Sequence, residues 1–216
     1  MPGAPAAETL RVALELGRMF DRLGIPYLVG GSLASSLHGI PRATQDADLV
    51  IDLRRHRVEA LVAALEKDFY VDLERARAAA ARRASFNVIH LGTMLKVDLF
   101  VLRDEEFHRG QMARRARMRL GETSESTVEV ASAEDTVIEK LRWYRLGGET
   151  SERQWLDVLG VLKVQGGSLD RDYLRRWADD QGVRDLLDRA FLEAGITPGP
   201  PGAGRSVPGG GFPAGS

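Results

Sequence analysis

The sequence predicts an α+β protein, with a small mixed β-sheet flanked by helices and then a lobe made of helices alone. Short alternating or β-branched apolar segments lie between helical segments up to residue 131. Residues 132–196 show only helical periodicity, and residues 197–216 are mostly glycine and proline. We therefore expect a core over 1–131, a C-terminal helical lobe over 132–196 and a disordered tail over 197–216.

The first elements follow from apolar spacing and from glycine and proline signals. Residues 8–23 have one apolar helical face, and Gly24 and Pro26 end that helix. An apolar strand over 25–29 runs into a Gly-Gly-Ser turn, where Ser32 is expected to cap a short helix that ends near Gly39. The β-branched run 47–53 predicts the next strand.

The middle of the chain contains segments with helical spacing and segments that alternate with the period of a strand. Helical spacing predicts a helix over 55–68 and an exposed helix over 73–84. Segments 85–91 and 95–102 alternate with period two around Gly-Thr-Met, which indicates an antiparallel hairpin. A helix over 105–119 and a strand over 127–131 complete the core.

The last third of the chain consists of capped helices. Ser132 and Asp135 form a capping box that opens a helix ending at Leu146, and Ser151 opens the next helix. Helices over 170–179 and 183–194 complete the lobe.

Composition limits the chemistry that is open to this chain. There are 30 basic and 31 acidic residues, a formal net charge of −1 and no cysteine. A thiolate zinc site, a disulfide framework and a cysteine nucleophile are therefore excluded, which leaves carboxylates, hydroxyls, histidine or a hard metal ion. No apolar run is long enough for a membrane helix, so we expect a cytoplasmic protein without a membrane partner.

The near-neutral charge means that any nucleic acid would be bound by a local patch. The most basic stretch contains Arg109, Arg114, Arg115, Arg117 and Arg119. These residues either contact RNA phosphates or form a solvated helix face that is offset by neighbouring acids. The second interpretation is the simpler one.

Three aspartates occupy positions where a carboxylate is unusual. Asp46 and Asp48 are two residues apart at the start of a strand, so their side chains point to the same face of the sheet. Asp98 lies in the middle of an apolar strand. If these strands pair, the three carboxylates converge, and a cation such as Mg²⁺ or Mn²⁺ is needed to offset their repulsion.

The Gly30-Gly31-Ser32 turn precedes a helix, where free backbone N–H groups make an anion site. A phosphate at this turn beside a metal on the aspartates describes a site for a nucleoside triphosphate. The order of these motifs resembles the signature of the DNA polymerase β-like nucleotidyltransferase superfamily: a Gly-Gly-Ser turn, an Asp-x-Asp pair and a later third carboxylate.

The segment Arg-Ala-Thr-Gln-Asp-Ala-Asp over 42–48 is similar to the variant found in the AbiEii (abortive infection) toxin nucleotidyltransferases and their relatives. Glu139-Lys140-Leu141 and the segment 151–158 resemble the lysine helix and the following helix of that group, although Gln154 replaces a usual aspartate. The resemblance spans about residues 25–164.

This resemblance implies a nucleotidyltransferase core and a role for each matching residue. Asp46, Asp48 and Asp98 would bind Mg²⁺ or Mn²⁺, and Asp98 would also activate the acceptor hydroxyl. Lys140 would reach the triphosphate, and Asp157 would support the site from the helical lobe. The remaining matches would bind the NTP co-substrate, namely Gly30, Gly31, Ser32, Arg42 and Thr44.

The resemblance implies transfer of a nucleoside monophosphate from an NTP to a hydroxyl of tRNA or a protein, in a toxin–antitoxin or phage-defence system with a cognate antitoxin. One alternative is transfer to a small molecule such as an aminoglycoside or lincosamide, for which an acidic cleft would select a cationic substrate. A second alternative is a non-catalytic nucleotide-binding or partner-binding module, and the presence of all three carboxylates argues against it.

Overall fold

The computed structural model describes residues 4–44, 46–120 and 126–197 of the chain. Its element order confirms the predicted α+β class, with every described strand before Ser132 and only helices after it. Except for Thr197, the tail expected over 197–216 lies outside the described residues. No described helix is long and apolar enough to cross a membrane. The elements of the first half are α1 (Ala4–Leu23), β1 (Tyr27–Val29), α2 (Gly31–His38), β2 (Ala47–Ile51), the 3₁₀ turn η1 (Arg55–Arg57), α3 (Val58–Leu65), β3 (Phe69–Val71), α4 (Leu73–Arg82), β4 (Ser85–His90) and β5 (Lys96–Val101).

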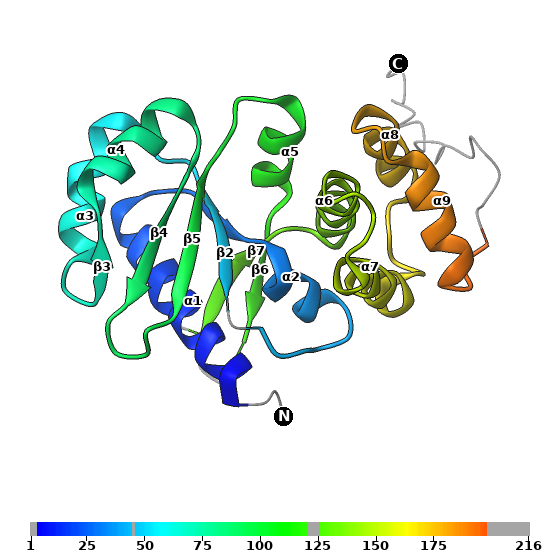
Figure 1. Cartoon of the computed structure of the whole chain (residues 1–216), viewed down its shortest axis with the longest axis horizontal. Helices are drawn as coiled ribbons and strands as arrows, with labels where there is room; N and C mark the ends of the chain where they lie inside the picture. Colours follow the sequence, from blue (N-terminus) through cyan, green and yellow to red (C-terminus); the bar gives the residue numbers. More distant parts are fainter. Residues whose placement is uncertain (1–3, 45, 121–125, 198–216) are drawn as a thin grey trace, which may run out of the picture.

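The second half contains a short helix, a hairpin and the helical lobe. Its elements are α5 (Glu106–Arg114), β6 (Ala116–Arg119), β7 (Thr127–Val130), α6 (Ala133–Leu146), α7 (Glu152–Gln165), α8 (Arg171–Asp180) and α9 (Arg184–Glu193). Figure 1 shows the sheet with α1, α3 and α4 around it, and α6 to α9 gathered on the opposite side of the molecule.

The described strands form one mixed sheet in the order β3-β4-β5-β2-β1-β7-β6. β2 lies in the middle, parallel to β5 and antiparallel to β1. Alternation along β2 and β5 buries one face in the main hydrophobic cluster, through Leu49, Ile51, Leu99 and their neighbours. The opposite face carries Asp48 and Asp98 and is only half-buried. The central strands therefore present these carboxylates on the open side of the sheet.

Helix α2 joins the sheet to the helical lobe, because glycines allow close contact with α7. A Cβ on Gly39 would lie 2.6 Å from the backbone nitrogen of Val161, so no larger residue fits there without a shift. Gln165 on α7 also donates from Nε2 to the carbonyl oxygen of His38 at 2.8 Å. This junction fixes α7 against the Gly30-Gly31-Ser32 turn and the loop that follows α2.

Hydrophobic side chains outside this junction form a second cluster. Apart from Phe107 on α5, its buried members come from the chain between Val137 and Phe191. The predicted capping box is present at the start of α6, where Ser132 Oγ accepts from the Asp135 backbone N–H and donates to the Asp135 carboxylate. Ser151 caps α7 as predicted.

Two local predictions were wrong, and one strand was missed. The helix expected over 105–119 ends at Arg114, and Ala116–Arg119 forms strand β6, because pairing with β7 overrides the helical preference of an arginine-rich segment. Strand β3 over Phe69–Val71 was not predicted, since three residues give too short a pattern. Helix α4 was expected to be exposed but buries an alanine face against the main cluster through Ala76, Ala79 and Ala80.

Candidate active site

The turn between β1 and α2 depends on two glycines. Gly31 has a φ of +55°, and a Cβ there would lie 1.9 Å from Oδ2 of Asp48, so both backbone and space require glycine. The Gly30 N–H donates to the carbonyl oxygen of Asp48 at 2.8 Å. The start of α2 is therefore held directly against the Asp48 carboxylate.

The prediction that Ser32 caps this helix was wrong. The helix begins at Gly31, with Gly30 as its N-cap and no side-chain cap, so Ser32 lies inside the first turn. Its hydroxyl instead accepts hydrogen bonds from Arg42 Nη2 at 2.7 Å and from Lys140 Nζ at 3.4 Å. Ser32 thus links the turn to two cationic side chains.

The two central strands place Asp48 and Asp98 side by side. They are partners in the parallel register of β2 and β5, on the half-buried face of the sheet. Burial raises the pKa of the Asp48 carboxyl above its usual value, and the charges of Asp98 and Asp46 raise it further. The carboxylates therefore repel one another, and a bound cation would reduce this repulsion.

Asp46 lies just before β2 and is exposed, so it stands at the edge of this cluster. Thr44 supports the same loop from inside: its Oγ1 donates to the Asp46 carbonyl oxygen at 3.0 Å, and its own carbonyl accepts from Thr9 Oγ1 at 3.0 Å. Thr44 is buried. The structure shows Thr44 as a support of the loop, and its nucleotide contact stays a prediction.

Lys96 is a member of the site that the sequence interpretation missed. Its Nζ lies 3.0 Å from Oδ2 of Asp98, and that hydrogen bond, with the charges of Asp98, Asp46 and Asp48, raises the pKa of the Lys96 ammonium. The signal was present in the sequence, because a residue two before Asp98 on the same strand faces the same side. Lys96 offsets part of the negative charge.

The donor set fits a hard cation in part. Asp48 and Asp98 supply carboxylate oxygens, the ligands that Mg²⁺ and Mn²⁺ prefer. Within residues 4–44, 46–120 and 126–197, no three His, Cys, Asp or Glu side chains lie close enough together to form a metal-binding group. A two-carboxylate site open to further ligands, such as phosphate oxygens and water, is what the described residues provide.

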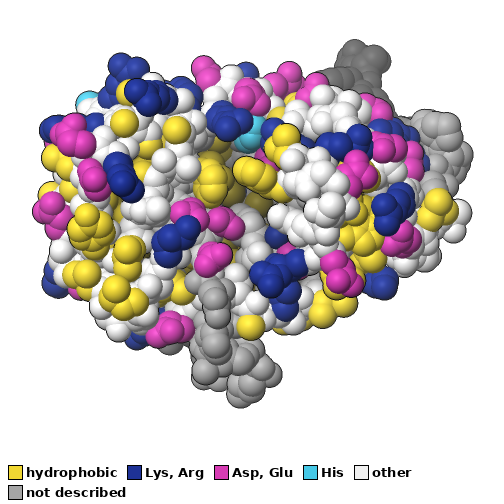
Figure 2. Space-filling model, in the orientation of Figure 1, with side chains coloured by type: hydrophobic (Ala, Val, Ile, Leu, Met, Phe, Trp, Pro, Cys, Tyr) yellow, Lys and Arg dark blue, Asp and Glu magenta, His cyan; other side chains and the backbone are white. Residues whose placement is uncertain are grey.

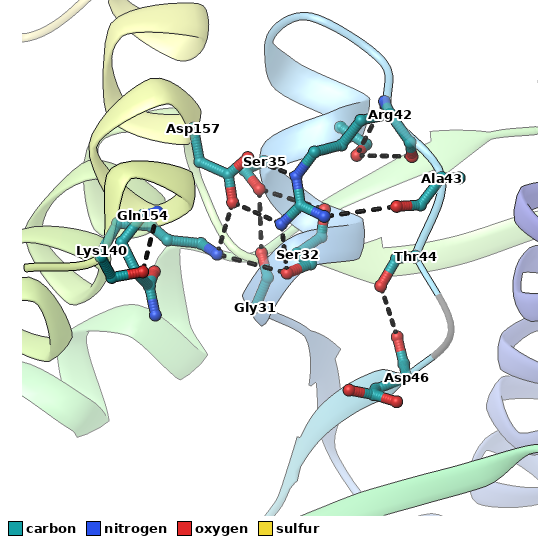
Figure 3. A network of polar contacts seen from close by, with 12 residues as sticks. Gly31, Ser32, Ser35, Arg42, Ala43, Thr44, Asp46, Lys140, Gln154 and Asp157 are labelled. Carbon is teal, nitrogen blue, oxygen red and sulfur yellow. Dashed lines mark hydrogen bonds and ion pairs between the residues drawn. The ribbon is translucent and has the colours of Figure 1, made fainter. Parts of the chain in front are cut away.

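Opposite the carboxylates, a network of ion pairs joins the loop after α2 to the helical lobe (Figure 3). Arg42 donates to Asp157 in a bidentate pair, from Nε to Oδ1 at 2.6 Å and from Nη2 to Oδ2 at 2.8 Å. Lys140 on α6 donates to Oδ2 of the same Asp157 at 2.8 Å. One carboxylate on α7 therefore holds two cations, and both cations also reach Ser32.

This network is largely removed from water. The side chains of Lys140 and Asp157 are 7% and 5% exposed, and that of Arg42 is 27% exposed. Burial alone would raise the pKa of the Asp157 carboxyl, but the hydrogen bonds from Arg42 and Lys140 and their charges outweigh it and hold the pKa below its usual value. Two cations against one anion leave positive charge beside the N-terminus of α2, where an anion is favoured.

The predicted residues thus fall into two groups that face the same turn. Asp48 and Asp98 form the acidic group, with the exposed Asp46 only at its edge, so the predicted convergence of three metal-binding carboxylates is not seen. Arg42, Lys140 and Asp157 form the cationic network around Ser32. Gln154 lies on α7 with its Oε1 buried and without a hydrogen-bond partner in the described part of the chain. Figure 2 shows a hollow between the sheet and the helical lobe, with a hydrophobic floor and acidic side chains along one rim.

A Gly-Gly turn against a strand carboxylate, a second carboxylate in register and two cations held by Asp157 are arranged on a nucleotidyltransferase-like fold. Solved structures that share this fold include the following two. An antigenic nucleotidyltransferase-like protein from Paracoccidioides brasiliensis is 18% identical over 88% of this chain and 94% of its own, with a TM-score of 0.51. The antibiotic-resistance factor ANT(2'')-Ia is 16% identical over 88% of this chain and 99% of its own, with a TM-score of 0.51.

The family is settled by sequence. The family model described as nucleotidyl transferase AbiEii toxin, Type IV TA system, matches residues 16–201. This chain therefore belongs to the AbiEii family of nucleotidyltransferases. A comparison with curated protein sequences gives no match.

Proposed function

We propose that this protein transfers a nucleoside monophosphate from an NTP to a hydroxyl of tRNA or a protein, with Mg²⁺ as cofactor, as the toxin of a cytoplasmic toxin–antitoxin pair. The observation that carries the proposal is the placement of opposite charges on two sides of one turn. Asp48 and Asp98 stand on the sheet side, and Arg42 and Lys140 stand on the lobe side.

In this proposal the triphosphate lies along the Gly30-Gly31-Ser32 turn. The first N–H groups of α2 and the Lys140 ammonium donate to phosphate oxygens, and the Arg42 guanidinium orients Lys140 through their common partner Asp157. These groups are ordered before substrate arrives, so they lose little freedom when the phosphate binds.

Asp48 and Asp98 would hold the metal, with Asp46 at the edge of the site. Bound there, Mg²⁺ would neutralise charge on the reacting phosphate and on the leaving pyrophosphate. Asp98 accepts the proton of the acceptor hydroxyl while the oxygen of that hydroxyl forms a bond to the α-phosphorus. The bond from that phosphorus to the bridging oxygen breaks, and the electron pair leaves with pyrophosphate.

The surroundings of Asp98 favour an anionic acceptor. A pocket of about 290 Å³ lies between α4 and the part of β4 that β3 leaves unpaired. Arg75 and Arg82 line it, with Ser85, Asn87 and Asp98. Because Arg75 pairs with Asp72 at 3.5 Å, Arg82 is the cation of this pocket that would attract a phosphate of tRNA. Of the two macromolecular acceptors, the pocket favours tRNA.

The first experiment is label transfer from each α-³²P-NTP with Mg²⁺, using total tRNA, a protein extract or an aminoglycoside as acceptor. We expect label on tRNA with the wild type and none with Asp48→Asn. Asp172→Asn is the matched control, because Asp172 is exposed on α8, far from the site in the sequence and in the fold. Absence of transfer to every acceptor, together with absence of NTP binding in calorimetry, would reject the proposal.

The acceptor is tested separately by charge reversal in the pocket. Arg82→Glu is expected to lower labelling of tRNA about tenfold, because it adds repulsion for phosphate, while NTP binding stays unchanged. The exposed Arg11 on α1 gives the control variant Arg11→Glu. Label on protein, with no effect of Arg82→Glu, would identify a protein acceptor instead.

A further inference from the structure

A second pocket, of about 340 Å³, opens at the other end of the central strands, and five of its eleven lining residues are arginines. Its volume lies near the lower end of small-ligand pockets, about 300–1,000 Å³. The arginines come from three separate segments of the chain: the loop after β2, the end of α4, and the stretch from the end of β5 to just past α5. They are Arg54, Arg83, Arg103, Arg109 and Arg115.

The carboxylates of this arginine pocket neutralise only part of its charge. Asp52 pairs with Arg54 at 3.2 Å, and Asp104 pairs with Arg109 at 2.6 Å. No other acidic residue lines the pocket among the described residues. Arg109 and the nearby Arg83 and Arg54 lower the pKa of the Asp104 carboxyl, first through the hydrogen bond from Arg109. The pocket is therefore cationic in a chain whose net charge is −1.

Three of the arginines have no carboxylate of the pocket as a partner. Arg83 Nη1 donates to the carbonyl oxygen of Leu102 at 2.6 Å, and Arg115 Nη1 donates to that of Met112. The buried Nε of Arg115 makes no hydrogen bond within the described residues, and its Glu129 neighbour lies 3.8 Å away. Exposed Arg103 makes no hydrogen bond or ion pair with any described residue.

The backbone of Arg83 has an uncommon conformation. Arg83 adopts a φ of +51°, a left-handed conformation that residues other than glycine rarely take. This residue ends α4 and turns the chain so that its guanidinium reaches the end of β5. The hydrogen bond to Leu102 holds this guanidinium at the wall of the cationic pocket.

We propose that this arginine pocket binds phosphate groups. Several guanidinium groups, each a planar fork of donors, match phosphate oxygens better than they match an isolated carboxylate. The phosphates would come either from the backbone of an RNA or from a free polyphosphate, since both offer the same oxygens.

The pocket is separate from the candidate active site. Asp52 follows Asp48 by four residues on the same face, which places the two about 13 Å apart along β2. Between them, Val50 and Phe100 are half-buried partners on the open face of the sheet. A triphosphate on the Gly-Gly turn would not fill the arginine pocket, whereas an RNA strand crossing this face would reach both. The proposal does not rest on nucleotidyl transfer.

The test is a titration of the ¹⁵N-labelled full chain, followed by NMR, with sodium tripolyphosphate in one arm and a short single-stranded RNA in the other. We expect the amide signals of residues 101–104 and 109–115 to shift in at least one arm, as a set distinct from the signals of residues 30–32. Shifts with RNA alone would identify a backbone phosphate, and equal or larger shifts with tripolyphosphate would identify a free polyphosphate.

Arg103→Glu removes the unpaired cation without breaking any contact in the described structure. We expect it to weaken binding at this set of signals about tenfold, as the loss of a charge-assisted hydrogen bond implies, and Arg11→Glu to change it less than about twofold. Unchanged spectra of the free variants confirm folding. If neither ligand shifts residues 101–104 and 109–115, or if both variants bind equally, the proposal is overturned.

Discussion

The two sides of the candidate active site differ in how their charges are compensated. On the lobe side, Asp157 is bound by Arg42 and Lys140, and its pKa is held below the usual value. On the sheet side, Asp48 faces Asp98, and its pKa is raised by burial and by like charge. The ion pairs of the lobe side form without a ligand, whereas the carboxylates of the sheet side repel one another until a cation binds. The first is preorganised for an anion, and the second stores the repulsion that a metal relieves.

The largest expected effect is on the acidic side. Asp48→Asn should lower nucleotidyl transfer about 10³-fold or more, because the proposed metal site would lose a central carboxylate. The same change should not lower the melting temperature at neutral pH, because the carboxylate it removes is a repelled one. Label transfer and differential scanning calorimetry measure both. A variant that loses stability along with activity would contradict the repulsion between Asp48 and Asp98.

Breaking the cationic network, in contrast, should lower the stability of the fold. Asp157→Ala leaves Arg42 and Lys140 without their shared carboxylate and should lower the free energy of unfolding by about 3 kcal/mol. Urea denaturation measures it. The control is Asp185→Ala, which breaks an exposed pair with Arg145 and should cost less than about 1 kcal/mol. Equal costs for both variants would show that the network adds nothing.

The turn between the two sides should tolerate no side chain at Gly31. Gly31→Ala combines a left-handed φ with an overlap on the Asp48 carboxylate, and should cost about 2–3 kcal/mol. Gly30→Ala is the matched control, because its Cβ would find no atom closer than 3.9 Å, and we expect a change within about 0.5 kcal/mol. Urea denaturation of the two variants compares them directly.

Acid should weaken the lobe side selectively. Because the pKa of Asp157 is lowered in the folded protein, its contribution to stability is complete above the usual pKa of an aspartate. That contribution is lost as the pH falls through the lowered pKa. The difference in unfolding free energy between the wild type and Asp157→Asn should therefore shrink on acidification, measured by urea denaturation from neutral pH down to pH 3. A difference that grows with acid would refute the assignment.

The smallest expected effect concerns Lys96, the cation that the chain itself supplies to the acidic side. Lys96→Met should lower stability by less than about 1 kcal/mol, since the lysine side chain is about half exposed. Added Mg²⁺ should raise the melting temperature of this variant more than that of the wild type, because more repulsion is left to relieve. An identical rise in melting temperature for both proteins would show that Lys96 does not affect metal binding.

Local chemistry in the sequence accounts for most of the acidic side and for little of the cationic network. The Gly30-Gly31-Ser32 turn and the Asp46-x-Asp48 pair are short-range patterns, and strand alternation already places Asp48 on one face. By contrast, Arg42 and Asp157 are 115 residues apart, so no local spacing links them. Only the packing of α2 on α7 brings them together.

The sequence by itself determined the α+β class, the capped helices of the lobe and the identity of the carboxylates, because these depend on neighbours within a few residues. Tertiary structure decided the register that pairs Asp48 with Asp98, the conversion of residues 116–119 into a strand, and the meeting of Lys140 and Arg42 on Asp157. These features depend on strand order and helix packing, whose energies come from contacts distant in the chain. The arginine pocket belongs to the same group, since three separate segments build it.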